Sequence, residues 1–115
     1  MGTDVASMPR AQPRDMAKSL TDLGLLAWLP RRSRDLYVAQ GALCPYCGRK
    51  FSTGRRGVAR RPTIDHVVPR ARGGGDGPGN EVLAHARCNF TKADRMPHPC
   101  EILFAEITGE ILRSA

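Results

Sequence analysis

The spacing of hydrophobic positions predicts two short helices near the amino terminus. Residues 1–18 show no apolar period and are rich in Gly, Pro, Ser and mixed charges, so a disordered tail is expected there. Ser19 can cap a helix whose apolar residues follow at helical spacing up to residue 27, and Pro30 ends this helix. A second helix is predicted over residues 33–40, with a glycine at its carboxyl end.

The middle of the chain changes to the β-branched pattern of short strands. In RPTIDHVVP, residues 61–69, Thr, Ile and Val surround an Asp-His pair, which predicts a strand that the last proline ends. RARGGGDGPGN, residues 70–80, contains five glycines and predicts a flexible loop. A second strand is expected over EVLAHA, residues 81–86, and a helix over residues 88–96.

An amphipathic helix is predicted after the break Pro97-His98-Pro99, although Gly109 weakens it. Its apolar face contains Cys100, Leu103, Phe104, Ile107 and Ile111. The pattern as a whole predicts a small α+β domain with flanking helices. Its expected parts are the tail, a helical segment, the stranded domain and the terminal helix, at residues 1–18, 19–40, 41–96 and 97–115.

The charge is strongly positive and unevenly distributed. The 115 residues contain 18 Lys and Arg against 11 Asp and Glu, a net charge of +7. Residues 31–95 alone contain 14 basic and 5 acidic residues, which leaves +9 for the part that carries the motifs. Arginines predominate there, and guanidinium groups bind phosphate oxygens bidentately, so the balance favours a nucleic acid as partner over a merely soluble basic protein.

Six arginines in this basic part are candidates for phosphate contacts. The alternative is a solvated loop, and the sequence favours neither reading. The candidates are Arg55, Arg56, Arg60, Arg61, Arg70 and Arg72.

The apolar segments of the sequence bear on the cellular location of the protein. Asp4, Pro9 and Pro13 interrupt any apolar core of a secretory signal, and the longest strongly apolar run, residues 25–29, is too short to span a membrane. A cytoplasmic location is therefore expected, where cysteines stay reduced and serve as metal ligands more often than as disulfides. A domain this short often needs a bound metal ion or another cross-link to be stable.

The cysteine spacing predicts a structural zinc site. Cys44 and Cys47 form a Cys-x-x-Cys knuckle, and His85 and Cys88 repeat the two-residue spacing. Three thiolates and one imidazole make a closed tetrahedral set for Zn²⁺. Cys100 competes with His85 for the fourth place, but it lies beyond the proline break and lacks the paired spacing.

The residues between and after these ligands resemble an HNH endonuclease. The resemblance rests on Asp65-His66-Val-Val-Pro-Arg-x-Arg-Gly-Gly, then Asn80, then His85-x-x-Cys88-Asn89-x-x-Lys92, and with the knuckle it covers roughly residues 41–96. It implies a ββα-metal domain that hydrolyses DNA. Asn89 stands at the last position of the His-Asn-His triad, a common substitution, and His85 stands where many zinc-containing members have cysteine.

The resemblance implies a role for each residue, and the residue chemistry is compatible with it. His66 is suited to act as general base, and Asp65 and the Asn89 amide oxygen are hard ligands for Mg²⁺ or a similar cation. Asn80 would brace the loop or the base, and Lys92, on the helical face of Asn89, would meet a phosphate. The alternative is that Asp65 and His66 are a structural strand pair and Asn80 a turn residue.

The sequence therefore predicts a divalent-metal-dependent DNA endonuclease with a structural zinc. Small free-standing chains of this kind resemble phage or mobile-element nucleases, some of which act beside packaging proteins, by analogy alone. One alternative is a zinc-stabilised DNA-binding module without cleavage. The other is a protein-interaction adaptor that docks through the acidic terminal helix.

Overall fold

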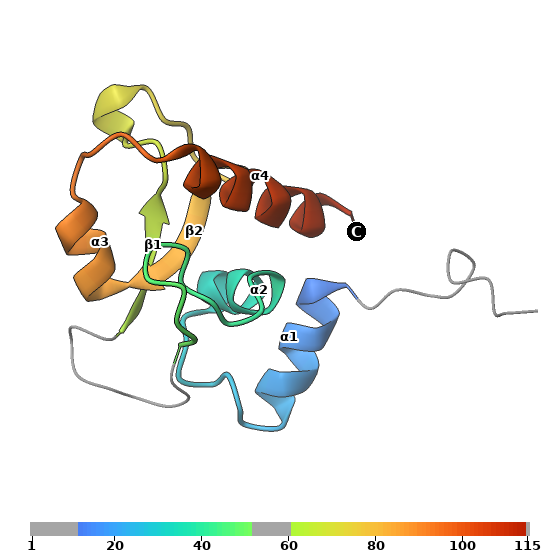
Figure 1. Cartoon of the computed structure of the whole chain (residues 1–115). Coiled ribbons are helices and arrows are strands. Elements are labelled where there is room, and N and C mark those ends of the chain that lie inside the picture. Colours follow the sequence, from blue (N-terminus) through green and yellow to red (C-terminus); the bar gives the residue numbers. More distant parts are fainter. Residues whose placement is uncertain (1–11, 52–60, 115) are drawn as a thin grey trace, which may run out of the picture.

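The computed structural model describes residues 12–51 and 61–114 (Figure 1). These residues form four α-helices, one 3-10 turn and two strands. In chain order the elements are α1 Pro13–Asp22, α2 Arg31–Ala39, β1 Pro62–His66, the 3-10 turn η3 Arg70–Arg72, β2 Glu81–His85, α3 Ala86–Lys92 and α4 Pro99–Arg113.

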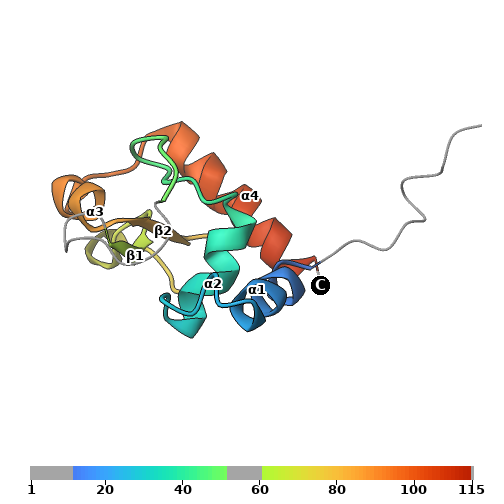
Figure 2. The ribbon, with the colours of Figure 1, turned by 90° about the horizontal axis from the view of Figure 1, so that it is seen from below.

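The two strands form an antiparallel pair between two layers of helices. Asp65 lies opposite Val82 and Ile64 opposite Leu83. In both views α3 lies on one side of the sheet, and α2 and α4 lie on the other (Figures 1 and 2). Val82, Leu83 and Ala84 of β2 have no exposed surface, as expected of a strand covered on both faces.

Three clusters of apolar side chains fill the space between the elements. They centre on Leu36, Cys44, Phe51, Leu83 and Ala84, on Ala17, Leu26 and Leu29, and on Val67, Val82 and Ala105. The first cluster contains Cys44, one of the predicted zinc ligands, and Tyr46 packs against it, so the knuckle is anchored in the core through these two residues.

Gln40, at the carboxyl end of α2, takes the place of a third strand beside β2. Its side-chain amide donates to the carbonyl of Leu83 at 2.9 Å and accepts from the N–H of Leu83 at 2.6 Å. These bonds satisfy buried backbone groups at the edge of a sheet that has only two strands.

The first helix begins and ends earlier than its apolar spacing predicts. It starts at Pro13, inside the segment expected to be a disordered tail, because proline is well suited to the first helical position and Asp15 lies in the first turn. It ends at Asp22, and Gly24 follows with φ +82°, which leaves Leu23 73% exposed.

Most of the expected apolar face of the terminal helix α4 is exposed, although Phe104 packs against the core. Leu103 and Ile107 are 55% and 51% exposed, while Ala105 and Thr108 are buried against the domain. Gly109 is needed for this packing, because a Cβ there would lie 2.4 Å from the backbone nitrogen of Gly79. No helix of the described residues is long and apolar enough to cross a membrane.

Candidate functional site

The four predicted zinc ligands come together at the base of the sheet. One ligand atom from each of Cys44, Cys47, His85 and Cys88 lies within 4.8 Å of the others, a group that could hold a metal ion. In the knuckle, the backbone carbonyl of Cys44 accepts a hydrogen bond from the N–H of Gly48 at 2.9 Å, and Gly48 has φ +70°. Cys100 is exposed and lies outside the group, so His85 rather than Cys100 completes it.

The imidazole of His85 presents Nδ1 to the sulfurs. Nδ1 lies 3.4 Å from Sγ of Cys47 and 3.9 Å from Sγ of Cys88, and the ring packs 4.8 Å from that of Phe51. Burial, and then the neighbouring thiols Cys44 and Cys47, raise the pKa of Cys88 to about 12. A bound metal ion would supply the positive charge that favours the thiolate forms of the three cysteines.

On the α3 side of β1, Asp65 lies in a buried polar cluster. Its Oδ2 accepts a hydrogen bond from the hydroxyl of Tyr46 and lies 3.5 Å from Nζ of Lys92. Burial, and then Asp65, raise the pKa of Tyr46 above its ordinary value, so the phenol stays a donor. The side chains of Lys92 and Asp65 are only 1% and 8% exposed.

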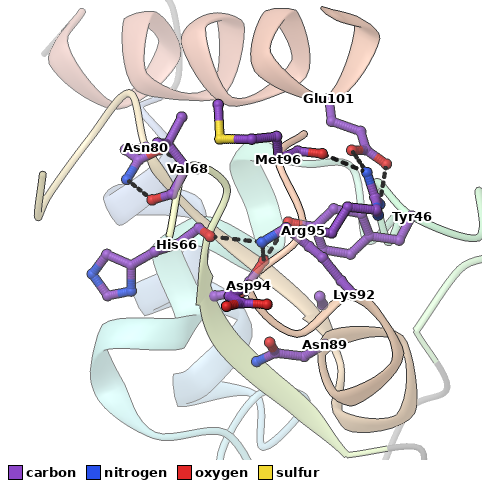
Figure 3. Close-up of polar contacts among 12 residues, drawn as sticks. Tyr46, His66, Val68, Asn80, Asn89, Lys92, Asp94, Arg95, Met96 and Glu101 are labelled. Carbon is purple, nitrogen blue, oxygen red and sulfur yellow. Dashed lines mark hydrogen bonds and ion pairs between the residues drawn. The ribbon is translucent and has the colours of Figure 1, made fainter. Parts of the chain in front are cut away.

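Lys92 and Asn89 both reach from α3 to β1. The Lys92 ammonium donates to the carbonyl of His66 at 3.0 Å (Figure 3). Nδ2 of Asn89 donates to the Thr63 hydroxyl at 3.3 Å. Asn89 thus lies beside the strand that bears Asp65. Lys92 is held inside the fold, so a contact with phosphate would require it to leave Asp65.

The imidazole of His66 points away from Lys92 and Asn89, as Figure 3 shows. Adjacent residues of a strand face opposite sides, so His66 and Asp65 lie on different faces of β1. Nε2 of His66 lies 2.7 Å from Oδ1 of Asp76 and 3.8 Å from Oε2 of Glu81. The guanidinium of Arg70 contacts Asp76 at 2.9 Å and that of Arg32 pairs with Glu81. His66, Asp76 and Glu81 form the second group among the described residues that could hold a metal ion.

Asn80 fastens the glycine-rich segment to the end of β1. Its Oδ1 accepts from the N–H of Val68 at 2.8 Å, and its Nδ2 donates to the carbonyls of Val68 and Gly75 at 3.1 and 2.8 Å. Gly74 lies so close to Val68 that a Cβ would come within 1.7 Å of the Val68 carbonyl oxygen. The expected flexible loop is therefore folded around hydrogen bonds at these positions.

The predicted phosphate-binding arginines are only partly described. Arg61, Arg70 and Arg72 are exposed. Arg70 is engaged with Asp76, and Nε of Arg72 donates to the carbonyl of Asp94 at 2.7 Å. The other three, Arg55, Arg56 and Arg60, lie outside the described residues.

Sequence reasoning missed three residues of the site: Tyr46, Asp76 and Glu81. Tyr46 stands between the knuckle cysteines, where a side chain directed away from the sulfurs can reach the neighbouring strand. Asp76 lies in a glycine-rich segment without a periodic pattern, so its spacing carries no signal. Glu81 begins a strand, and only the antiparallel register, which places it opposite His66, could have indicated it.

Two antiparallel strands followed by a helix, with a group of three Cys and one His that could hold a metal ion, are consistent with a small ββα-metal type of domain. Residues 44–95 match the family model described as HNH endonuclease. The matched segment contains all four cluster residues and the Asp-His pair. A comparison with curated proteins finds no match.

Proposed function

We propose that the protein is an endonuclease that hydrolyses phosphodiester bonds of DNA with the help of a divalent cation. The observation that carries this proposal is the end of β1 within the HNH segment. Asp65 and His66 are consecutive residues there, and Asn89 stands beside the strand. The two side chains face opposite sides of β1, so both serve one site only if the chain bends where the strand ends at His66. The net charge of +7 supports a polyanionic substrate.

In this proposal His66 is the general base. An imidazole takes a proton from the attacking water at neutral pH, and such a group typically contributes on the order of 10²–10⁴-fold to a rate. The ring is partly exposed, with its side chain 21% accessible, so water and substrate can approach it. Asn80 would keep the base in place by fixing the segment that follows β1.

Asp65 and Asn89 are the proposed ligands of the catalytic cation. The Oδ1 atoms of both residues have no hydrogen-bond partner among the described residues, and no buried side-chain oxygen there lacks a partner. Both oxygens therefore keep their capacity to bind a cation, and carboxylate and amide oxygens suit Mg²⁺. A bound cation would neutralise charge on the phosphoryl oxygens and help the leaving oxygen depart.

Lys92 explains why such a cation site would be weak without substrate. Its ammonium already balances part of the Asp65 charge at 3.5 Å. Mg²⁺ is commonly bound by one or two carboxylates together with substrate phosphates. We therefore expect affinity for the cation to rise when DNA is present.

The second metal in the proposal is a structural Zn²⁺ held by Cys44, Cys47, His85 and Cys88. Three sulfurs and one nitrogen leave no open coordination position, so this ion would stabilise the domain rather than take part in hydrolysis. The exposed arginines Arg61 and Arg72 would contact phosphates, as would Arg55, Arg56 and Arg60.

A plasmid-nicking assay with Mg²⁺ or Mn²⁺ tests the proposal. His66→Ala should lose cleavage at every cation concentration while keeping fold, zinc content and DNA binding. Asp65→Asn and Asn89→Ala should recover part of their activity at higher cation concentration, because they weaken a ligand rather than remove the base. Full nicking by His66→Ala would refute the assignment.

Two other functions each have one observation in their favour. A DNA-binding module without cleavage is favoured by the buried pairing of Asp65 with Lys92, which makes Asp65 a structural residue. A protein-interaction adaptor is favoured by the exposed Leu103 and Ile107 on α4. The first would bind DNA in a salt-dependent way without nicking it, and the second would do neither.

A further inference from the structure

The contact between Asp76 and His66 decides where the proton of the imidazole lies. Oδ1 of Asp76 is 2.7 Å from Nε2 of His66. Hydrogen bonds from His66 and then Arg70 lower the pKa of Asp76 below its ordinary value, so the group is a carboxylate, which only accepts hydrogen bonds. Nε2 must therefore carry the hydrogen in this contact.

Arg70 competes for the same nitrogen. Its Nε lies 3.3 Å from Nε2 of His66 and 3.1 Å from Oδ1 of Asp76. Nε2 cannot donate a hydrogen to Asp76 and at the same time accept one from Arg70. The contact with the Asp76 carboxylate is the shorter of the two and is the one that forms. The Arg70 hydrogen therefore goes to Asp76, which receives both donors.

This arrangement leaves Nδ1 of His66 as the acceptor nitrogen. No hydrogen bond meets Nδ1 among the described residues, and no buried side-chain nitrogen there lacks a partner. Nδ1 is therefore open to solvent. A neutral imidazole with its hydrogen on Nε2 has its lone pair on Nδ1, where a water could give up a proton.

The segment that carries Asp76 is fixed on both sides. The residue before it, Gly75, accepts from Asn80 at 2.8 Å, and the residue after it, Gly77, donates its N–H to Glu81 at 2.7 Å. Glu81 is itself buried and paired with Arg32 of α2. The fold therefore holds the Asp76 backbone in place although its side chain is 66% exposed.

His66, Asp76 and Glu81 could instead bind a metal ion. Each carboxylate, however, already has a guanidinium partner, Arg70 for Asp76 and Arg32 for Glu81. A divalent cation would have to approach two arginines to reach its ligands. The pairing therefore favours a hydrogen-bonded imidazole over a metal site.

We propose that Asp76 is a positioning residue that holds His66 in its Nε2–H tautomer and so selects Nδ1 as the atom that accepts the proton from water. The tautomer follows from the contacts alone. The catalytic consequence rests on the proposed nuclease function.

Nitrogen NMR of the zinc-loaded protein tests the tautomer directly. Spectra are recorded about two pH units above the ordinary imidazole pKa of ~6.5, with His66→Ala to assign the signals. The parent should show the Nε2–H form. In Asp76→Ala the Arg70 guanidinium becomes the remaining neighbour of Nε2, so the Nδ1–H form should appear, whereas Asp76→Glu should restore the parent signals and Asp94→Ala should leave them unchanged.

Single-turnover cleavage tests the consequence. Asp76→Ala should lower the rate constant about 10–100-fold with little change in half-saturating DNA, and Asp76→Glu should recover part of it. Added to His66→Ala, the substitution should have no further effect, because both act through one group. An equal loss in both backgrounds would refute the positioning role.

The two proposals fail separately. If the parent does not cut DNA, the nuclease assignment is wrong. The tautomer of His66 is still decided by the NMR measurement alone. A parent-like tautomer in Asp76→Ala would overturn the role of Asp76 whatever the activity. Titration with Ni²⁺ that shifts His66 in the parent and not in Asp76→Ala would replace it with a metal site.

Discussion

Replacing Lys92 with methionine probes the buried pair that joins α3 to β1. Methionine keeps an unbranched chain of similar length and removes the charge. In the parent, Nζ of Lys92 lies 3.5 Å from Oδ2 of Asp65 and donates to the carbonyl of His66 at 3.0 Å. It also lies 5.6 Å above the ring of Tyr46. The variant therefore leaves the Asp65 carboxylate without its cation.

The loss of stability should be large for one substitution. At 3.5 Å and an effective dielectric constant of ~20, the gross attraction of the pair is on the order of 5 kcal/mol. Breaking a buried pair by removing one partner typically costs about 3–5 kcal/mol. For a domain of this size each kcal/mol lowers the Tm by about 4–8 °C, so a drop of more than about 10 °C is expected by differential scanning calorimetry.

The same variant reports on the proposed cation site. Without Lys92 the carboxylate of Asp65 should attract Mg²⁺ or Mn²⁺ more strongly, so millimolar cation should restore part of the lost Tm. The double variant Lys92→Met/Asp65→Asn should show no such rescue, and Lys50→Met, at an exposed lysine, should melt like the parent. A Tm of Lys92→Met within about 2 °C of the parent, or rescue that persists in the double variant, would contradict the reasoning.

Two further predictions concern zinc and DNA. Metal analysis should find one Zn²⁺ per chain, and chelation should unfold the domain, because the cluster residue Cys44 belongs to the core; Cys47→Ser should lower the Tm, and a parent-like melt would exclude a structural metal. Neutralising Arg55 and Arg56 together should flatten the slope of log affinity against log salt by up to about 2, one unit for each lost phosphate contact. The paired control is Arg14 and Lys18 on α1, which should leave the slope unchanged.

The sequence could predict the strands and the metal cluster because short-range chemistry determines both. The β-branched residues around Asp65 indicate the strand, although β1 ends at His66 rather than continuing to Pro69, and the paired two-residue spacings indicate the ligands. The structure has β1 at Pro62–His66 and places Cys44, Cys47, His85 and Cys88 within reach of one ion. The family match over residues 44–95 confirms the resemblance that these motifs carry.

What the sequence could not predict depends on packing between distant segments. Gly109 reads as a weak point of a helix, yet it permits α4 to approach the backbone of Gly79. The sequence predicts Lys92 as a cation on the helical face of Asn89 that would meet a phosphate. In the structure α3 packs against β1 and buries Lys92 against Asp65. The contact of Asp76 with His66 depends on a glycine-rich segment that only its hydrogen bonds to Asn80 and Glu81 fix.

The proposed zinc site and the proposed cation site are connected through shared structural elements. Tyr46 stands between the two knuckle cysteines and donates its hydroxyl hydrogen to Asp65, so the knuckle reaches the carboxylate directly. His85 and Cys88 straddle the start of α3, and Asn89 follows at once. Any ion that fixes the four ligands therefore also fixes both proposed cation ligands, Asp65 through the phenol and Asn89 through the helix. Such an ion can be indispensable for hydrolysis without touching the substrate, because it determines where the second cation can be held.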